Sequence, residues 1–143
     1  MKLAKAFFAC ACCLALAGVA TAQTDGTRTR TIQRAVKGPA DKDIQIGIFM
    51  NVKADCQAGP LPSIRLAEPP AHGKVVVKRA NVSATNYKQC LALQAPAYVA
   101  FYHSAANFVG EDYFTLEVNF PGGPTEVQKF TATIGLSQPG PKI

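Results

Sequence analysis

The sequence predicts an all-β protein, with a mature part that folds as a single antiparallel β-sandwich of about seven short strands in two sheets. Several segments alternate apolar and polar residues with a period of two, as in strands that bury one face. Proline and glycine separate these segments at short intervals. No segment after residue 22 keeps the apolar spacing of three and four that is typical of a helix. This pattern favours two packed sheets, with a small closed barrel as the alternative.

The first 22 residues have the order of zones found in a secretory signal peptide. Lys2 and Lys5 give a positive start, residues 7–20 are almost wholly apolar, and small residues end the segment at Ala22. The apolar run is shorter than the roughly 20 residues that span a membrane. We therefore expect cleavage after Ala22, a periplasmic or secreted mature protein, and no transmembrane segment once the signal is removed.

The remaining residues, 23–143, fit one ordinary domain with a modest positive charge. The full chain has 15 Lys and Arg against nine Asp and Glu, and loss of Lys2 and Lys5 lowers the excess from six to four. No ordered set of aromatic residues accompanies this charge, so we expect no nucleic-acid partner. Weak attraction to an anionic polymer of the cell envelope is compatible with it.

Two of the five cysteines, Cys56 and Cys90, lie outside the signal peptide. An even pair in an exported chain is most simply a disulfide, because export delivers it to an oxidising compartment. Neither cysteine has a second one two or three residues away, as a redox or metal site would need. Closing the loop from 56 to 90 is expected to stabilise the fold by about 3.8 kcal/mol through loop-closure entropy.

Residues 23–40 are predicted to form a flexible basic arm, or at most a loosely held edge strand, ahead of a sandwich at 41–137. Four basic residues of this arm are candidates for contact with an anion: Arg28, Arg30, Arg34 and Lys37. Gly38 and Pro39 interrupt the segment. Two prolines beyond residue 138 predict a frayed tail at 138–143.

Seven strands are expected within residues 41–137. They lie near 44–52, 64–66, 75–77, 90–93, 98–103, 113–120 and 126–136. Pro96 ends the fourth, since proline cannot donate to a strand ladder. A turn at 121–124 makes the last two strands an antiparallel hairpin. The inward-facing residues expected on the first and the last two strands are Ile44, Ile46, Ile48, Met50, Val52, Phe114, Leu116, Val118, Phe120, Phe130, Ala132, Ile134 and Leu136.

Two motifs lie in the stretch from residue 68 to 118. A Pro-x-His-Gly turn leads into a valine-rich strand, and a Phe-x-Gly-x-Asp-x-Phe sequence leads into a later strand. The matching residues are Pro70, His72, Gly73 and Val75 in the first motif and Phe108, Gly110, Asp112 and Phe114 in the second. With these motifs the chain resembles the cadherin-like and immunoglobulin-like (Big-type) repeat domains of bacterial envelope and secreted proteins. The resemblance implies an immunoglobulin-like sandwich that serves in binding or structure.

The sequence departs from the repeat pattern in three respects. His103 stands where the repeats have proline, and a disulfide between the two cysteines is not part of the usual repeat. Glu111 and Asp112 are the only adjacent acidic pair, too few oxygen ligands for the junctional calcium sites of the wider cadherin class. Calcium binding is therefore not carried over from the resemblance.

Each matched position also has a physical reason of its own. Gly73 and Gly110 are expected to adopt positive φ in tight turns. Asp112 can accept hydrogen bonds from nearby backbone N–H groups of its turn. Phe108 and Phe114 are expected to form a core pair across the corner.

No pattern in the sequence indicates catalysis, a cofactor or a metal centre, and the protein is not expected to be an enzyme. Ser104 follows His103 directly, but neighbours on a strand point to opposite faces. A transition-metal site needs three or four convergent ligands. His72, His103 and Met50 could contribute to such a site only if folding brought them together.

The sequence thus predicts an exported, non-enzymatic β-sandwich that acts as a binding or structural module in the periplasm or extracellular space. Its candidate contact surfaces are the loops at 69–73 and 121–124, the basic arm, and an exposed edge strand that pairs with a partner. The partner is expected to be an envelope or extracellular protein or an anionic polymer. The alternative is a small periplasmic metal or ligand carrier that uses His72 and His103.

Overall fold

The structure is a computed structural model and describes residues 28–135. Its strands, in chain order, are β1 (Thr29–Pro39), β2 (Asp43–Phe49), β3 (Ser63–Glu68), β4 (Gly73–Tyr87), β5 (Cys90–Ser104), β6 (Gly110–Asn119) and β7 (Thr125–Gly135). The described part contains no helix, and hence none long and apolar enough to cross a membrane. The predicted signal peptide at 1–22 and the predicted tail at 138–143 lie outside the described residues.

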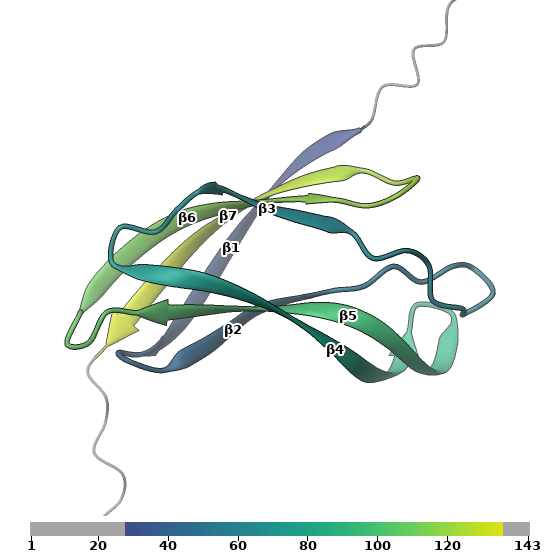
Figure 1. Ribbon diagram of the computed structural model, residues 1–143, viewed down its shortest axis with the longest axis horizontal. Helices are drawn as coiled ribbons and strands as arrows, with labels where there is room; N and C mark the ends of the chain where they lie inside the picture. Colours follow the sequence, from purple (N-terminus) through teal and green to yellow (C-terminus); the bar gives the residue numbers. More distant parts are fainter. Residues whose placement is uncertain (1–27, 136–143) are drawn as a thin grey trace, which may run out of the picture.

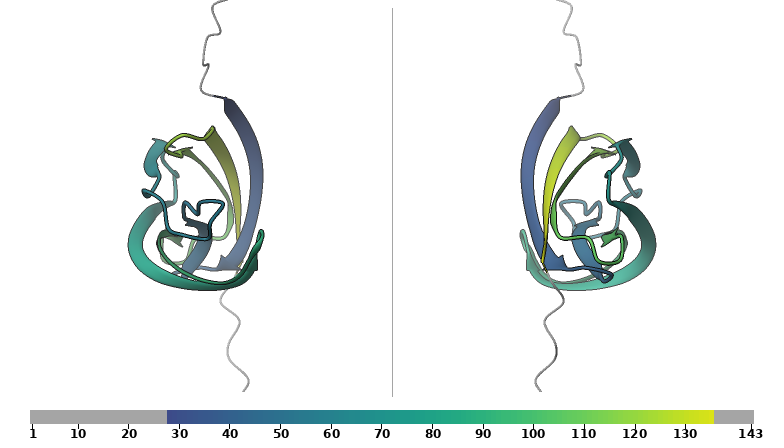
Figure 2. Two further views of the ribbon diagram at one scale, coloured as in Figure 1. Left: turned by 90° about the vertical axis from the view of Figure 1, so that its right-hand side faces the viewer. Right: turned by 90° about the vertical axis from the view of Figure 1, so that its left-hand side faces the viewer.

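The strands form two sheets that pack face to face (Figures 1 and 2). One sheet has the order β1-β7-β6-β3 and the other the order β2-β5-β4. Apart from the first strand, this is the arrangement of an immunoglobulin constant-type domain, with the third, sixth and seventh strands facing the second, fifth and fourth. The predicted immunoglobulin-like sandwich of seven strands is confirmed, and it is antiparallel except at β1.

Strand β1 corrects the prediction of a flexible basic arm. Thr29–Pro39 pairs in parallel with β7 along its whole length, from Thr29 opposite Thr125 to Pro39 opposite Gly135. The loosely held edge strand considered as the alternative is therefore closer to what the structure shows, and the domain begins before residue 41. The alternation expected of a strand was hard to recognise in this segment, because arginines occupy two of the positions that face the opposite sheet.

Strand β5 corrects the prediction of two strands separated at Pro96. A single strand runs from Cys90 to Ser104, and Pro96 lies opposite Asn81 of β4. On its other side, β5 pairs with β2 only from Tyr98 to His103. The missing N–H of Pro96 thus lies where β5 has one neighbour, and proline is tolerated on such an open side. The total is still seven, as predicted, because the two strands that merge into β5 are offset by the additional strand β1.

A β-bulge in β2 changes which of its residues face inward. The register against β5 shifts between Gln45 and Gly47, and an extra residue reverses the alternation that follows. Phe49 is therefore buried and Ile48 is 41% exposed, contrary to the prediction. The strand ends at Phe49, so the predicted continuation to 52 is also wrong.

The core lies between the sheets, mainly under β5, β6 and β7. Tyr102, Phe114 and Phe130 form a continuous stack with centroid separations of 5.2 and 4.8 Å. The inward-facing residues predicted for β6 and β7 are buried here: Phe114, Leu116, Val118, Phe130, Ala132 and Ile134. Phe120 packs on this core from just beyond β6, which pairs with β7 as the predicted antiparallel hairpin.

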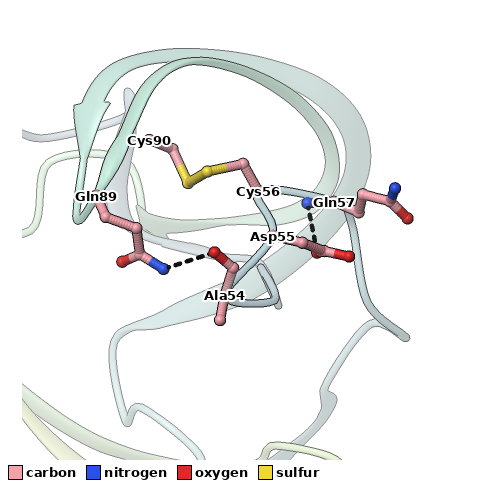
Figure 3. Close-up of a disulfide and its surroundings, with 6 residues drawn as sticks. All are labelled: Ala54, Asp55, Cys56, Gln57, Gln89 and Cys90. Carbon is pink, nitrogen blue, oxygen red and sulfur yellow. Dashed lines mark hydrogen bonds between the residues drawn. A yellow bond between two sulfur atoms is a disulfide. The ribbon is translucent and has the colours of Figure 1, made fainter.

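The predicted disulfide between Cys56 and Cys90 is present, with a Cα–Cα distance of 5.7 Å. Figure 3 shows it joining the β2–β3 connection to the tip of the β4–β5 hairpin. The Gln89 amide donates a hydrogen bond of 3.0 Å to the Ala54 carbonyl beside it. The covalent link therefore fixes the part of the β4–β5 hairpin that extends past β2.

Candidate functional site

The two sequence motifs meet at one corner of the sandwich, around the buried carboxylate of Asp112. This side chain is 2% exposed and belongs to β6. It accepts hydrogen bonds from the backbone N–H groups of Ala71 (2.9 Å) and His72 (2.8 Å), in the turn before β4. It also accepts one of 2.8 Å from the hydroxyl of Tyr102 in β5. Asp112 thereby ties one sheet to the other.

These contacts determine the charge state of the corner. Burial opposes ionisation of Asp112, but the hydrogen bonds from His72, Tyr102 and Ala71 outweigh it and lower the pKa of the carboxyl. Burial and the bond to Asp112 together raise the pKa of the Tyr102 hydroxyl. Asp112 is thus an ionised acceptor with four donors around it, the fourth being the backbone N–H of Tyr113 at 3.1 Å.

Three of the neighbouring motif residues pack in ways that the sequence did not reveal. His72 stacks on Phe108, with ring centroids 4.3 Å apart, so Phe108 does not form the expected pair with Phe114. Gly110 has the expected positive φ of 138°. Gly73 does not, and it is required for space instead, since a Cβ there would lie 2.6 Å from the His103 carbonyl oxygen. Every contact at this corner serves folding.

His103 lies elsewhere, on the outer face of the three-stranded sheet. Its ring nitrogens lie 2.8 Å from an Asp43 carboxylate oxygen and 3.2 Å from one of Asp41. The bonds to Asp43 and then to Asp41 raise the pKa of His103. His72 and His103 therefore have separate partners. Within residues 28–135 no group of three or more His, Cys, Asp or Glu side chains is placed to hold a metal ion.

A cleft of about 520 Å³ opens where β1 and β2 separate, and we call it the end cleft. The two strands are joined by the turn at 40–42 and diverge from it (Figure 1). The cleft lies at the far end, between the first half of β1 and the last half of β2. Its lining residues are Arg30, Arg34, Gly47, Ile48, Phe49, Met50, Asn51, Val52, Tyr87, Lys88, Phe120, Pro121, Gly122, Gly123, Pro124, Glu126 and Gln128.

Polar groups line the wall of the end cleft that β1 and β7 form. Glu126 and Gln128 occupy inward positions of β7 and are 6% and 2% exposed. The Gln128 amide donates a hydrogen bond of 2.6 Å to Glu126, whose other oxygen binds the Arg30 guanidinium. Buried carboxylates need such partners, because an unpaired charge is costly to remove from water.

Arg34 is the cation of this wall that remains available. It stands opposite Phe130 of β7 and shares the inward side of β1 with Arg30 and Ile32. Within residues 28–135 no hydrogen bond or ion pair engages its guanidinium. Lys88 supplies another positive charge from the β4–β5 turn on the opposite wall, with its Nζ 5.4 Å from the Tyr87 ring centroid. The lining therefore carries more positive than negative charge.

Two of the four predicted anion-contacting residues thus meet in the end cleft, Arg30 and Arg34. Arg28 precedes β1, where its carbonyl accepts a hydrogen bond of 2.9 Å from Thr125. Lys37 occupies the other face of β1, away from the cleft. The predicted loop surface at 121–124 also lines the cleft, whereas the loop at 69–73 belongs to the Asp112 corner. The alternation of Arg30, Ile32, Arg34 and Val36 was the signal that could have placed the arginines.

Comparison with known proteins adds little to this geometry. No protein-family model and no curated protein matches the sequence. A solved structure titled "Solution Structure of Amebosin" is similar to the chain at 11% sequence identity and a TM-score of 0.43, with 77% of this chain and 100% of that chain covered.

Proposed function

We propose that the chain is an exported, non-enzymatic binding module of the periplasm or extracellular space, and that the end cleft is its contact surface. The observation that carries this proposal is the open cleft itself, in which apolar and polar side chains surround an arginine that has no partner within residues 28–135. Recognition sites commonly combine a largely apolar concave surface with a few polar groups that fix orientation. The Asp112 corner offers no comparable surface, since its polar groups already bind one another.

The compartment is supported by the signal-peptide pattern and by the disulfide. Cys56 and Cys90 form a disulfide, and such bonds persist in oxidising compartments. The resemblance to bacterial cadherin-like and immunoglobulin-like repeats adds that sandwiches of this kind serve in adhesion and spacing. The partner that we propose is an envelope or extracellular protein, or an anionic polymer, that contacts the cleft.

The alternative of a metal carrier has less support. His72 stacks on Phe108, and His103 binds two aspartates on the outer face of the three-stranded sheet. A metal ion would have to displace one of these sets of contacts. Calorimetric titration with Cu²⁺ or Zn²⁺ at micromolar concentration would revive this alternative if it gave saturable heat that both His72→Gln and His103→Gln abolished.

Photocrosslinking in cells tests the proposed surface. A photoreactive p-benzoylphenylalanine replaces Met50, which lines the end cleft, and in a matched control it replaces Lys129, which is exposed on the outer face of β7. We expect a discrete crosslinked partner from position 50 and none from position 129. Equal crosslinking from the two positions, or none from position 50 in a well-folded variant, would refute the surface assignment.

A further inference from the structure

The size and lining of the end cleft define the chemistry of a ligand more closely than the proposed function does. Its volume of about 520 Å³ lies within the range of roughly 300–1,000 Å³ that is typical of sites for small organic groups. A single saccharide or peptide segment of this size could enter without displacing a strand. The ligand group that occupies the cleft is therefore compact.

Part of the cleft lining is apolar. Phe49 and Met50 contribute from the end of β2, and Val52 follows them. Phe120 and Pro124 contribute from the β6–β7 loop on the other side. Contact with these side chains favours an apolar body, since removing apolar surface from water is the main source of binding energy in such sites.

The opposite wall favours a negative head group. Glu126 already binds Arg30 and Gln128, so it has little capacity left for a ligand. Arg34 faces the same space without a partner in residues 28–135. A guanidinium binds a carboxylate through two parallel hydrogen bonds, a match of shape as well as of charge.

Glu126 and the cations of the lining act on an anionic head group in opposite directions. Repulsion from Glu126 and attraction to Arg34 and Lys88 both scale with the charge of the head group. Arg30 already offsets Glu126, so Arg34 and Lys88 leave the lining positive. The lining thus suits an anionic head group, and the paired donors of the Arg34 guanidinium match the two oxygens of a carboxylate.

We propose that the end cleft binds an amphiphilic carboxylate: a single carboxylate, held by Arg34, attached to an apolar chain or ring that packs against Phe49, Met50 and Phe120. This inference rests on the proposed function, which assigns the end cleft as the contact surface. Two sources can present this chemistry, a fatty acid and the C-terminus of a polypeptide that ends in apolar residues. The experiment distinguishes them.

The test is to titrate the disulfide-bonded protein with decanoate and with N-acetyl-leucyl-phenylalanine, and to follow binding by isothermal titration calorimetry and by NMR. Decanol and the amide of the dipeptide serve as uncharged controls. We expect saturable binding of at least one carboxylate, with amide shifts at Gly47, Gly122 and Gly123 in the cleft lining. Preference for decanoate indicates a fatty acid, and preference for the dipeptide indicates a chain end.

A matched pair of variants assigns the head group. Arg34→Gln should weaken carboxylate binding roughly ten- to a hundredfold, as expected for loss of a hydrogen-bonded charge. Lys37→Gln removes a charge from the other face of the same strand and should leave affinity unchanged. Arg34 has no partner within residues 28–135, so its replacement should not alter the melting temperature, which is measured alongside.

Several results would overturn the inference. They are the absence of saturable binding by both carboxylates at millimolar concentration, equal affinity for the uncharged controls, and equal affinity of the Arg34→Gln and Lys37→Gln variants. If crosslinking from position 50 captures a partner while no carboxylate binds, the proposed contact surface stands and only the ligand class is refuted.

Discussion

Replacing Asp112 with alanine should destabilise the fold strongly, because this one carboxylate joins the two sheets. The substitution leaves four donors without their charged acceptor: the N–H groups of Ala71, His72 and Tyr113, 2.9, 2.8 and 3.1 Å away, and the hydroxyl of Tyr102 at 2.8 Å. An unsatisfied buried donor costs about 1–3 kcal/mol. Tyr102 is fully buried, whereas water can reach the turn at His72. We therefore expect a loss of about 3–5 kcal/mol.

Urea and thermal denaturation, followed by circular dichroism without reductant, measure this loss. For a domain of this size it corresponds to a fall in melting temperature of roughly 12–20 °C. Glu111→Ala is the control, since among residues 28–135 the exposed Glu111 side chain bonds only to the hydroxyl of Tyr113. A loss below about 1 kcal/mol for Asp112→Ala, or an equal loss for the control, would refute the assigned role.

The pH dependence of the same variant gives an independent check. The folded protein holds the pKa of Asp112 below the reference value of 3.8. The stability that this carboxylate contributes is then fully present above that value and is lost as the pH falls through the lowered pKa. The Asp112→Ala variant should therefore lose less stability than the wild type on acidification below about pH 4.

Three further predictions address the disulfide, His103 and Gly73. Reduction of the disulfide, or the double substitution Cys56→Ser and Cys90→Ser, should lower the free energy of unfolding by about 2–4 kcal/mol in urea titrations. No change would show that closing the loop from 56 to 90 does not stabilise the fold. The folded state raises the pKa of His103 above 6.5, so the stability that His103 contributes should be complete below pH 6.5 and be lost as the pH rises through the raised pKa. The urea midpoint of His103→Gln should therefore lack this dependence on pH. The same pH dependence in the variant and the wild type would contradict the prediction. Gly73→Ala should cost about 1–3 kcal/mol through overpacking, whereas Gly135→Ala, with open space around its Cβ, should cost much less; equal melting temperatures would argue against the close approach at Gly73.

The parts of the fold that sequence predicted well are local. The β6–β7 hairpin joins neighbouring segments that both alternate cleanly, so each strand and its turn could be recognised in isolation. The disulfide followed from having two cysteines left after the predicted signal peptide. In these cases the information lies within a few residues or in a simple count.

The errors arose where a distant partner decides the outcome. Strand β1 pairs with β7, which lies at the other end of the domain's sequence. The inward arginines of β1 are accommodated because the end cleft is open beside them. Pro96 is acceptable inside β5 only because β2 ends before it. Asp112 accepts a hydrogen bond from the neighbouring Tyr113 N–H, as expected, but two of its other donors are 40 and 41 residues away. These long-range pairings cannot be recognised from a single sequence.

The end cleft itself could be predicted only in pieces. Arg30, Arg34 and the loop at 121–124 were candidates as separate surfaces, and the structure places them around one space. The divergence of β1 from β2, together with the bulge that turns Phe49 inward, creates that space. Neither feature has a local signature strong enough to locate a site.

Partner capture with a charge-reversal pair tests the central claim most directly. The tagged protein carries either Arg34→Glu, in the end cleft, or Lys37→Glu, on the outer face of the same strand, and is crosslinked in cells before mass spectrometry of the captured species. The two variants have the same net charge, so non-specific attraction changes equally in both. The account predicts that the partner is lost with Arg34→Glu and kept with Lys37→Glu. Retention by both variants, or loss from both, would contradict it.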